Sequence, residues 1–123
     1  MIKGIGVDIC DIERIAKAIK QEGFLRRVFS EEEIEYAEKN AVPAVHYASA
    51  FAAREALAKA GGWGVGRMGL KSCSVRRADN GPQFVFTDEF LKKLEGEKIK
   101  RVFLSLSHDG GIAAAMVVLE AEE

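Results

Sequence analysis

A carboxylate and an ammonium group lie four residues apart in an alanine-rich part of this sequence. Glu55 and Lys59 are separated by about one helical turn, as are Phe51 and Glu55, so all three would share one face of a helix. One interpretation is an exposed Glu55–Lys59 ion pair, which contributes only about 0.3–0.5 kcal/mol. The other places Glu55 on a metal ion and Lys59 on a phosphate, because charges set among apolar side chains need partners. The spacing leaves both interpretations open.

A second candidate carboxylate, Asp8, lies near the end of a strand expected over residues 2–9. Gly4, Gly6 and Asp8 would share one face of that strand, and glycines on one face indicate close approach by another backbone or a ligand. Asp8 alone fits a helix cap or a strand-end turn. Together with Glu55 it also fits Mg²⁺, which is usually held by one or two carboxylates plus substrate phosphates. Spacing does not show that the two carboxylates meet.

The third candidate is His108, in the run Ser107-His108-Asp109 that ends one expected strand and opens a turn. Serine, histidine and aspartate are the residue types of a hydrolytic triad. Adjacent residues cannot normally assemble that geometry, so we discount a triad here. A single histidine is more often a structural hydrogen-bonding residue than a catalytic one.

The elements that must position these residues follow from hydrophobic periodicity and cap signals. Helix 11–22 would be capped by Asp11, helix 30–39 by a Ser30–Glu33 capping box, and helix 44–60 would end at Gly61-Gly62. Residues 61–69 are glycine-rich and predict a loop. The remaining expected elements are strands 70–77 and 83–86, helix 87–94, and a hairpin of strands 101–107 and 112–119. This order predicts an α+β fold with a mainly antiparallel sheet packed with helices.

Composition narrows the functional classes. A chain of 123 residues predicts one domain, residues 1–123, and the net charge of -1 argues against a surface built for nucleic acid. The two cysteines, Cys10 and Cys73, have no metal or disulfide spacing and are expected to be small buried side chains. No stretch approaches the roughly 20 apolar residues that span a bilayer, and the first residues lack a signal-peptide layout. We therefore expect a cytoplasmic protein without membrane partners.

Four segments together resemble one family. They are GIGVDICDIERI at the start, FAAREALAKA running into GGWGVG, DNGPQF, and LSLSHDGGIAAAMVVLE near the end. Their order across nearly the whole chain is similar to that of the holo-[acyl-carrier-protein] synthases, the short type of 4'-phosphopantetheinyl transferase. The resemblance implies transfer of the 4'-phosphopantetheine arm of coenzyme A to a serine of an acidic apo-acyl carrier protein. It also implies release of 3',5'-adenosine bisphosphate, a role in fatty acid biosynthesis, and a homotrimer with active sites between subunits.

The resemblance assigns roles to particular residues. Asp8 and Glu55 match the positions that hold Mg²⁺ against the pyrophosphate, and Lys59 matches a basic residue near the transferred phosphate. The general base stays open between Glu55 and a metal-bound water. The expected coenzyme-binding residues are Arg54, Lys59, Gly62, Gly64, Gly66 and, from a neighbouring subunit, His108. Arg14 and Lys20 match carrier-binding positions on the first helix.

Three residues depart from the family pattern. Ala50 stands where an arginine is common, Arg54 replaces a lysine, and Gly23 replaces a basic residue. These departures leave room for a second interpretation, a non-catalytic module that binds coenzyme A or carrier protein. A metal-dependent phosphohydrolase with the same carboxylates is a third. The last expected strand, 112–119, is apolar on both faces and so predicts a packed interface.

Overall fold

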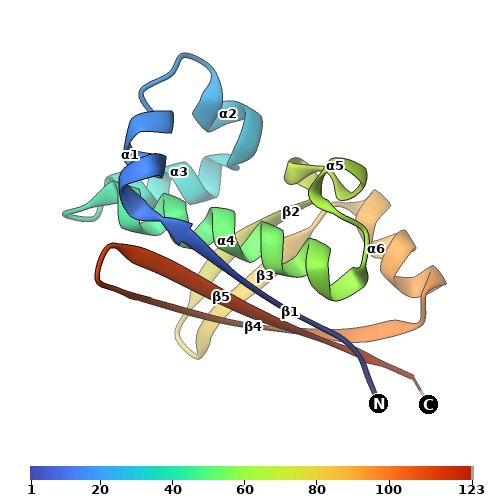
Figure 1. Ribbon diagram of the computed structural model, residues 1–123. Helices are drawn as coiled ribbons and strands as arrows, with labels where there is room; N and C mark the ends of the chain where they lie inside the picture. The colour runs from blue at the N-terminus through green and yellow to red at the C-terminus, as the bar shows by residue number, and fades with distance from the viewer. Residues whose placement is uncertain (123) are drawn as a thin grey trace.

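A computed structural model describes residues 1–122, which form two antiparallel sheets and the helices packed on them (Figure 1). The α+β class predicted from the sequence is confirmed. The elements in chain order are β1 (Ile2–Asp11), α1 (Ile12–Ala18), α2 (Phe24–Val28), α3 (Glu31–Glu38), α4 (Pro43–Gly61), α5 (Val65–Met68), a 3-10 turn (Leu70–Ser72), β2 (Cys73–Ala78), β3 (Gly81–Phe86), α6 (Asp88–Gly96), β4 (Ile99–Asp109) and β5 (Ile112–Ala121).

The larger sheet has the strand order β1-β5-β4, with every neighbouring pair antiparallel. The long helix α4 lies across one face of this sheet, and the β2–β3 hairpin flanks the same helix (Figure 1). Helices α1, α2 and α3 gather at one end of α4, while α5 and α6 lie toward the other. Both chain ends leave the sheet on the same side, because the start of β1 pairs with the end of β5.

The core lies between α4 and the inner face of the sheet. One side chain in two along β5 is buried there against the alanine-rich helix. The residues that β5 contributes are Ala113, Ala115, Val117, Leu119 and Ala121. The other face of β5 carries residues that are only partly covered, so the interface predicted for that strand would involve this outer face.

The glycines of β1 bring that strand directly onto α4. A Cβ atom built at Gly4 would overlap the carbonyl oxygen of Ala60, and one at Gly6 would overlap the carbonyl oxygen of Ala56. The sequence predicted close approach by another backbone or a ligand, and here the partner is the backbone of α4. Because the two backbones touch, polar side chains on the inner face of β1 and on the adjoining face of α4 must lie close together.

Several predicted boundaries hold, because local signals set them. Asp11 caps α1 by accepting hydrogen bonds from the backbone N–H groups of Glu13 and Arg14. The Ser30–Glu33 capping box is complete in both directions at the start of α3. Pro43 begins α4, at a position where a backbone N–H would have no partner within the helix. Gly62 caps the other end of the helix.

Other predicted boundaries were wrong. α1 ends at Ala18 and does not continue to residue 22, and the short α2 was not predicted. The glycine-rich segment 61–69 is not all loop, since it contains α5. The predicted strand 70–77 begins only at Cys73, after the 3-10 turn. Helices of four or five residues carry too few periodic positions to be recognised from sequence.

Candidate active site

Lys59 reaches from α4 to β1. Its Nζ donates a hydrogen bond to Oδ1 of Asp8 at 2.8 Å and a longer one to the carbonyl oxygen of Val7 at 3.3 Å. The bond to Asp8 raises the pKa of Lys59. Of the ion pairs among residues 1–122, none joins Lys59 to Glu55, so the surface pair considered from spacing is not the arrangement found. The lysine instead links the helix to the first strand.

Glu55 lies one turn before Lys59 and is partly buried. Burial raises the pKa of the Glu55 carboxyl, and the nearby negative charge of Asp8 raises it further. The positive charge of Lys59 lowers this pKa and offsets part of the increase. Within residues 1–122, no hydrogen bond to the Glu55 side chain is present, and the Lys59 ammonium bonds Asp8 and Val7 instead. Two carboxylates therefore repel one another across the contact of β1 with α4, and a cation placed between them would relieve that repulsion.

These residues fit a magnesium ion only if the substrate completes its coordination. Across residues 1–122 there is no cluster of three or more histidine, cysteine, aspartate or glutamate side chains that could hold a metal alone. Two hard oxygen ligands, Asp8 and Glu55, remain. Mg²⁺ is commonly held by one or two carboxylates plus phosphate oxygens and water, so this donor set suits a metal bound together with a phosphorylated substrate.

The glycine-rich segment follows the C-terminal end of α4. Gly62 and Gly64 have φ angles of 71° and 75°, a region that side chains with a Cβ atom rarely adopt. Both are exposed, and the space beside them is open. Gly66 lies within α5 and is also exposed. The segment thus offers accessible backbone after the end of α4, and its approach to a nucleotide stays a prediction.

Arg54 lies in the protein interior and not at the surface where a coenzyme could bind. Its side chain is 0% exposed and forms a two-pronged ion pair with Glu33 of α3, at 2.6 and 2.8 Å. It also donates to the carbonyl oxygens of Leu70, Cys73 and Ala50. A guanidinium group enclosed in this way cannot reach a coenzyme, so the coenzyme-binding role expected for Arg54 is corrected. Arg54 instead ties α4 to α3 and to the start of β2.

The expected carrier-binding residues lie at the end of the molecule where α1 begins. Arg14 is exposed on α1, and Lys20 is exposed in the turn after that helix, not on it. The charge of Arg14 acts on the thiol of Cys10, which lies two residues after Asp8 on β1. Gly23, where a basic residue was expected, precedes α2 with a φ of 82°.

His108 is the second-to-last residue of β4 and is exposed. In the sheet, Asp8 is in register with Ala115 of β5, and Ala115 with Leu106 of β4. Residues two apart along a strand point to the same face, so His108, like Leu106, faces α4. Asp8 also faces α4, but it lies on β1, two strands away from His108. The described part of the chain does not bring His108 into contact with Asp8, Glu55 or Lys59.

The protein-family comparison decides what kind of site this is. Residues 4–117 match the model of the 4'-phosphopantetheinyl transferase superfamily. The chain belongs to that superfamily. The match covers both carboxylates, Lys59 and His108, and with the relatives below it makes the chain an enzyme of the phosphopantetheinyl transferase class.

Relatives and solved structures show which members of the superfamily this transferase resembles. It is 43% identical to the holo-[acyl-carrier-protein] synthase of Syntrophus aciditrophicus, over 98% of this chain and 97% of the relative. The crystal structure of that synthase from Neisseria meningitidis matches with a TM-score of 0.89 at 35% identity, covering 98% and 99% of the two chains. A Bacillus anthracis synthase in complex with coenzyme A (3',5'-ADP) matches at 0.82 and 33% identity, covering 99% of each chain.

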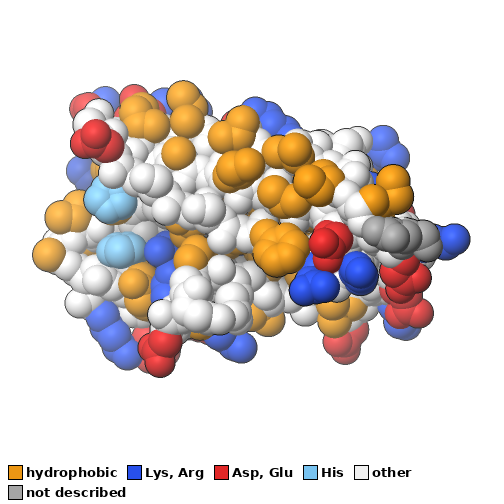
Figure 2. Space-filling model, turned by 90° about the horizontal axis from the view of Figure 1, so that it is seen from below, with side chains coloured by type: hydrophobic (Ala, Val, Ile, Leu, Met, Phe, Trp, Pro, Cys, Tyr) orange, Lys and Arg blue, Asp and Glu red, His pale blue; other side chains and the backbone are white. Residues whose placement is uncertain are grey.

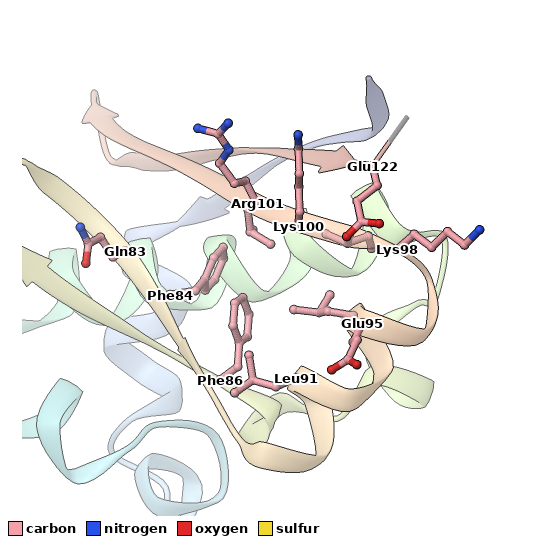
Figure 3. Close-up of a pocket in the computed structure, with 12 residues that line it drawn as sticks. Gln83, Phe84, Phe86, Leu91, Glu95, Lys98, Lys100, Arg101 and Glu122 are labelled. Atoms are coloured by element: carbon pink, nitrogen blue, oxygen red, sulfur yellow. The ribbon is translucent and has the colours of Figure 1, made fainter.

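A separate cavity of about 420 Å³ lies between β3, α6 and β4 of the transferase (Figure 3). Phe84, Phe86 and Leu91 form its apolar wall, and charged side chains of both signs surround it. Arg101, one of its basic residues, already pairs with Glu120 at 2.9 Å. None of the predicted site residues lines this cavity, so it is distinct from the candidate active site.

Sequence reasoning missed two features of the site. The first is the Lys59–Asp8 ion pair, which joins residues 51 positions apart and leaves no trace in local spacing. The second is the Arg54–Glu33 pair, which spans 21 positions. The only available signal for the second was an arginine within the alanine-rich run, since a buried charge requires a buried partner.

Proposed function

We propose that this transferase moves the 4'-phosphopantetheine arm of coenzyme A onto a serine of an apo-acyl carrier protein. The serine hydroxyl oxygen forms a bond to the phosphorus that bears the arm, and the bond from that phosphorus to the bridging pyrophosphate oxygen breaks. The serine proton is lost, and 3',5'-adenosine bisphosphate leaves. The grouping of Asp8, Glu55 and Lys59 where β1 touches α4 is the observation that carries this proposal.

Each member of that group has a task in phosphoryl transfer. The Lys59 ammonium neutralises charge that develops on the phosphate and the leaving group. The raised pKa of Glu55 favours proton acceptance at its carboxylate, so Glu55 is a candidate to take the serine proton, with a metal-bound water as the alternative. Asp8 and Glu55 hold Mg²⁺, which supplies charge neutralisation and orientation of the pyrophosphate when bound.

The remaining assignments extend this centre to both substrates. Gly62, Gly64 and Gly66 let the backbone approach the nucleotide, and His108 serves the coenzyme bound to a neighbouring copy. Arg14 and Lys20 meet the acidic carrier, where exposed charges steer association. Arg14 is exposed on α1, the helix that directly follows the strand of Asp8, which supports a serine delivered from that side. A cytoplasmic location and a role in fatty acid biosynthesis stay predictions from the resemblance. No helix within residues 1–122 is long and apolar enough to cross a membrane.

We also propose a homotrimer formed through the outer face of the larger sheet. Apolar side chains gather on the face opposite α4 (Figure 2). The large exposed members of this outer face are Ile5, Val7 and Ile9 of β1, Phe103 of β4 and Met116 of β5. An apolar surface of this kind on a small chain usually marks a contact with another protein. Packing of copies through it would cover these side chains.

Product analysis tests the proposed reaction. The protein is incubated with coenzyme A, Mg²⁺ and one of several apo-carrier proteins, and the intact masses of all species are measured. We expect the carrier to gain the mass of one arm while 3',5'-adenosine bisphosphate appears. Release of phosphopantetheine without a carrier would instead indicate a phosphohydrolase. Coenzyme A that binds but stays intact with every carrier would indicate a binding module and overturn the proposal.

A further inference from the structure

Trp63 is the single tryptophan of the chain, and it lies in the glycine-rich segment that follows α4. Its side chain is buried, although Gly62 and Gly64 on either side of it are exposed. The segment therefore combines an accessible backbone with one enclosed side chain. Glycines alone do little to hold a loop in one conformation, because glycine permits many backbone angles. Trp63 is thus the residue that can anchor the segment.

The indole ring of Trp63 packs between the end of α4 and α6 (Figure 1). Phe90 of α6 meets the ring edge-on with 5.3 Å between the ring centres, and the Lys93 ammonium lies 5.3 Å from the centre of the indole. On the α4 side, a Cβ atom built at Gly61 would come within 2.4 Å of the ring carbon atoms. Gly61 does not have a positive φ, so the space taken by the ring is what requires glycine there. The ring therefore occupies one defined place between the two helices.

Glu97, the residue that caps the C-terminal end of α6, holds the polar edge of this ring. Its Oε2 atom accepts a hydrogen bond from Nε1 of Trp63 at 2.9 Å, and the Lys93 ammonium lies 3.7 Å from the same oxygen. Lys3 of β1 donates a hydrogen bond of 2.8 Å to the backbone carbonyl oxygen of Glu97, and its ammonium lies 3.8 Å from Oε1. Glu97 thus joins the glycine-rich segment, α6 and β1 at one point.

The elements joined by Glu97 are those that carry the candidate centre. The backbone N–H groups of Gly62 and Trp63 each donate a hydrogen bond of 3.0 Å to a carbonyl oxygen in the last turn of α4, and one of these oxygens belongs to Lys59. Lys3 belongs to β1, the strand of Asp8. The contacts of Trp63 and Glu97 therefore fix the exposed glycine backbone relative to the last turn of α4 and to the first strand.

We propose that Trp63 and Glu97 are positioning residues, which hold the glycine-rich segment in its coenzyme-binding conformation before the coenzyme arrives. Ordering a mobile loop costs free energy that is subtracted from the free energy of binding, so a loop that is fixed in advance binds its ligand more tightly. The sequence singled out the glycines of this segment and not the two residues that anchor it. The inference rests on the proposed function, because it takes coenzyme A as the ligand of the segment.

The affinity for coenzyme A tests the anchor. Dissociation constants are measured by calorimetry with Mg²⁺, well below the Tm of each full-length protein. Glu97→Leu removes the acceptor of the Trp63 N–H, and we expect the dissociation constant to rise about three- to ten-fold, because the coenzyme must then order the loosened side chains. Glu97→Gln keeps an oxygen acceptor and should retain most of the affinity. Glu95→Leu, a change at an exposed carboxylate of the same helix, should bind as the wild type does.

Steady-state kinetics separates positioning from a general loss of stability. Glu97→Leu should raise the KM for coenzyme A by a similar factor and leave the KM for the carrier protein nearly unchanged. A variant that was only less stable would contain less active protein, which would lower kcat and leave both KM values as they are. That second pattern would contradict the positioning role.

Fluorescence reports on the anchor directly, because Trp63 is the only tryptophan. We expect the wild type to emit as a buried indole does, to be quenched weakly by acrylamide, and to change little when coenzyme A binds. In Glu97→Leu the emission should move to longer wavelength, be quenched more strongly, and return toward that of the wild type with coenzyme A. A wild-type tryptophan that acrylamide quenches strongly would show that the segment is not held in advance and would overturn the proposal.

A second variant protects the test against misfolding. If Glu97→Leu does not fold, Trp63→Phe replaces it in the binding and kinetic measurements, because phenylalanine keeps an aromatic ring against Phe90 and removes the N–H donor. We expect a weaker affinity for coenzyme A in this variant as well. A folded Glu97→Leu or Trp63→Phe protein that binds coenzyme A as tightly as the wild type would overturn the proposal.

Failure of the proposed function is separately visible. If the wild type binds coenzyme A but transfers no arm to any carrier, and Glu97→Leu weakens that binding, the anchor stands and the transferase proposal fails. If the wild type transfers the arm and Glu97→Leu keeps the wild-type affinity and KM for coenzyme A, the transferase proposal stands and the anchor does not. A wild type that binds no coenzyme A would overturn both.

Discussion

The ion pair between Lys59 and Asp8 contributes little to folding, because the lysine side chain is 57% exposed. Solvent and salt screen exposed pairs of this kind, so they add little to stability. The ammonium group can therefore leave Asp8 for a phosphate at small cost when the coenzyme binds. The opposite holds for Arg54, which is fully enclosed with Glu33, and removing one partner of such a pair typically costs about 3–5 kcal/mol. Two cationic residues of the same helix thus serve different purposes.

The carrier surface can be tested at a single residue. Arg14→Ala removes an exposed cation near the candidate centre without disturbing packing. We expect the KM for the acyl carrier protein to rise several-fold and the KM for coenzyme A to stay nearly constant, because rim charges steer a charged protein partner. Steady-state kinetics with each substrate varied in turn provides the measurement. Equal effects on both KM values would contradict the docking role.

The thiols allow a test of local burial. Burial raises the pKa of Cys10 to about 11 and that of Cys73 to about 12. Because the thiolate is the reactive form, both cysteines should be alkylated slowly at pH 7.5, and Cys73 should react only when the chain unfolds. Intact mass after iodoacetamide treatment, with and without denaturant, measures this. Rapid modification of Cys73 in the folded protein would show that the β2 side of the core opens readily.

At the level of elements, the contact of β1 with α4 determines where the candidate ligands lie. Gly6→Ala would place a methyl group against the carbonyl oxygen of Ala56. We expect a loss of about 1–3 kcal/mol in the free energy of unfolding, or more, because neither backbone can move without disturbing the core. Chemical denaturation measures it.

Gly96→Ala is the matched control for that substitution. Gly96 lies at the end of α6, has open space around it, and does not have a positive φ. Alanine there should leave stability unchanged or raise it slightly. Equal destabilisation by both substitutions would show that the tight β1–α4 contact is not what requires glycine at position 6.

The elements that could be predicted are those with local signals. The Ser30–Glu33 box and the run from Pro43 to Gly62 each contain their own start or stop. The Gly4 and Gly6 pattern even indicated a close backbone contact, though not which element would make it. Helices α2 and α5 were not predicted, because their boundaries depend on packing against the rest of the chain.

Local spacing also limited how far the site could be predicted. Asp8, Glu55 and Lys59 were singled out, but spacing left open whether Lys59 pairs with Glu55, and the structure has Lys59 on Asp8. Arg54 was assigned to the coenzyme, whereas its position on the buried side of α4 gives it Glu33. Both contacts join segments that are distant in the sequence, so they depend on how strands and helices pack and not on neighbouring residues.

At the scale of the whole molecule, the outer sheet face should hold the assembly together. We expect the wild type to have three times the chain mass in solution and Phe103→Glu to have the mass of one chain, because a charge in an apolar interface is costly. Loss of transfer should accompany dissociation if His108 acts on a neighbour's coenzyme. Sedimentation equilibrium gives the mass.

Leu91→Glu is the control for the assembly prediction. Leu91 on α6 is 48% exposed, as is Phe103, but it lines the cavity of Figure 3 and does not belong to the outer sheet face. This variant should keep the wild-type mass. A wild type that sediments as a single chain, or a Phe103→Glu protein that stays associated, would contradict the proposed interface.

The central claim is that arm transfer depends on the carboxylates at the contact of β1 with α4. The most direct test is the intact mass of an apo-carrier after incubation with coenzyme A, Mg²⁺ and either wild type or Glu55→Gln. Glutamine keeps the shape and removes the charge, so we predict at least about 100-fold slower transfer with unchanged circular dichroism and Tm. Glu35→Gln, a change at an exposed carboxylate of α3, should transfer normally. Full activity of Glu55→Gln would contradict the account.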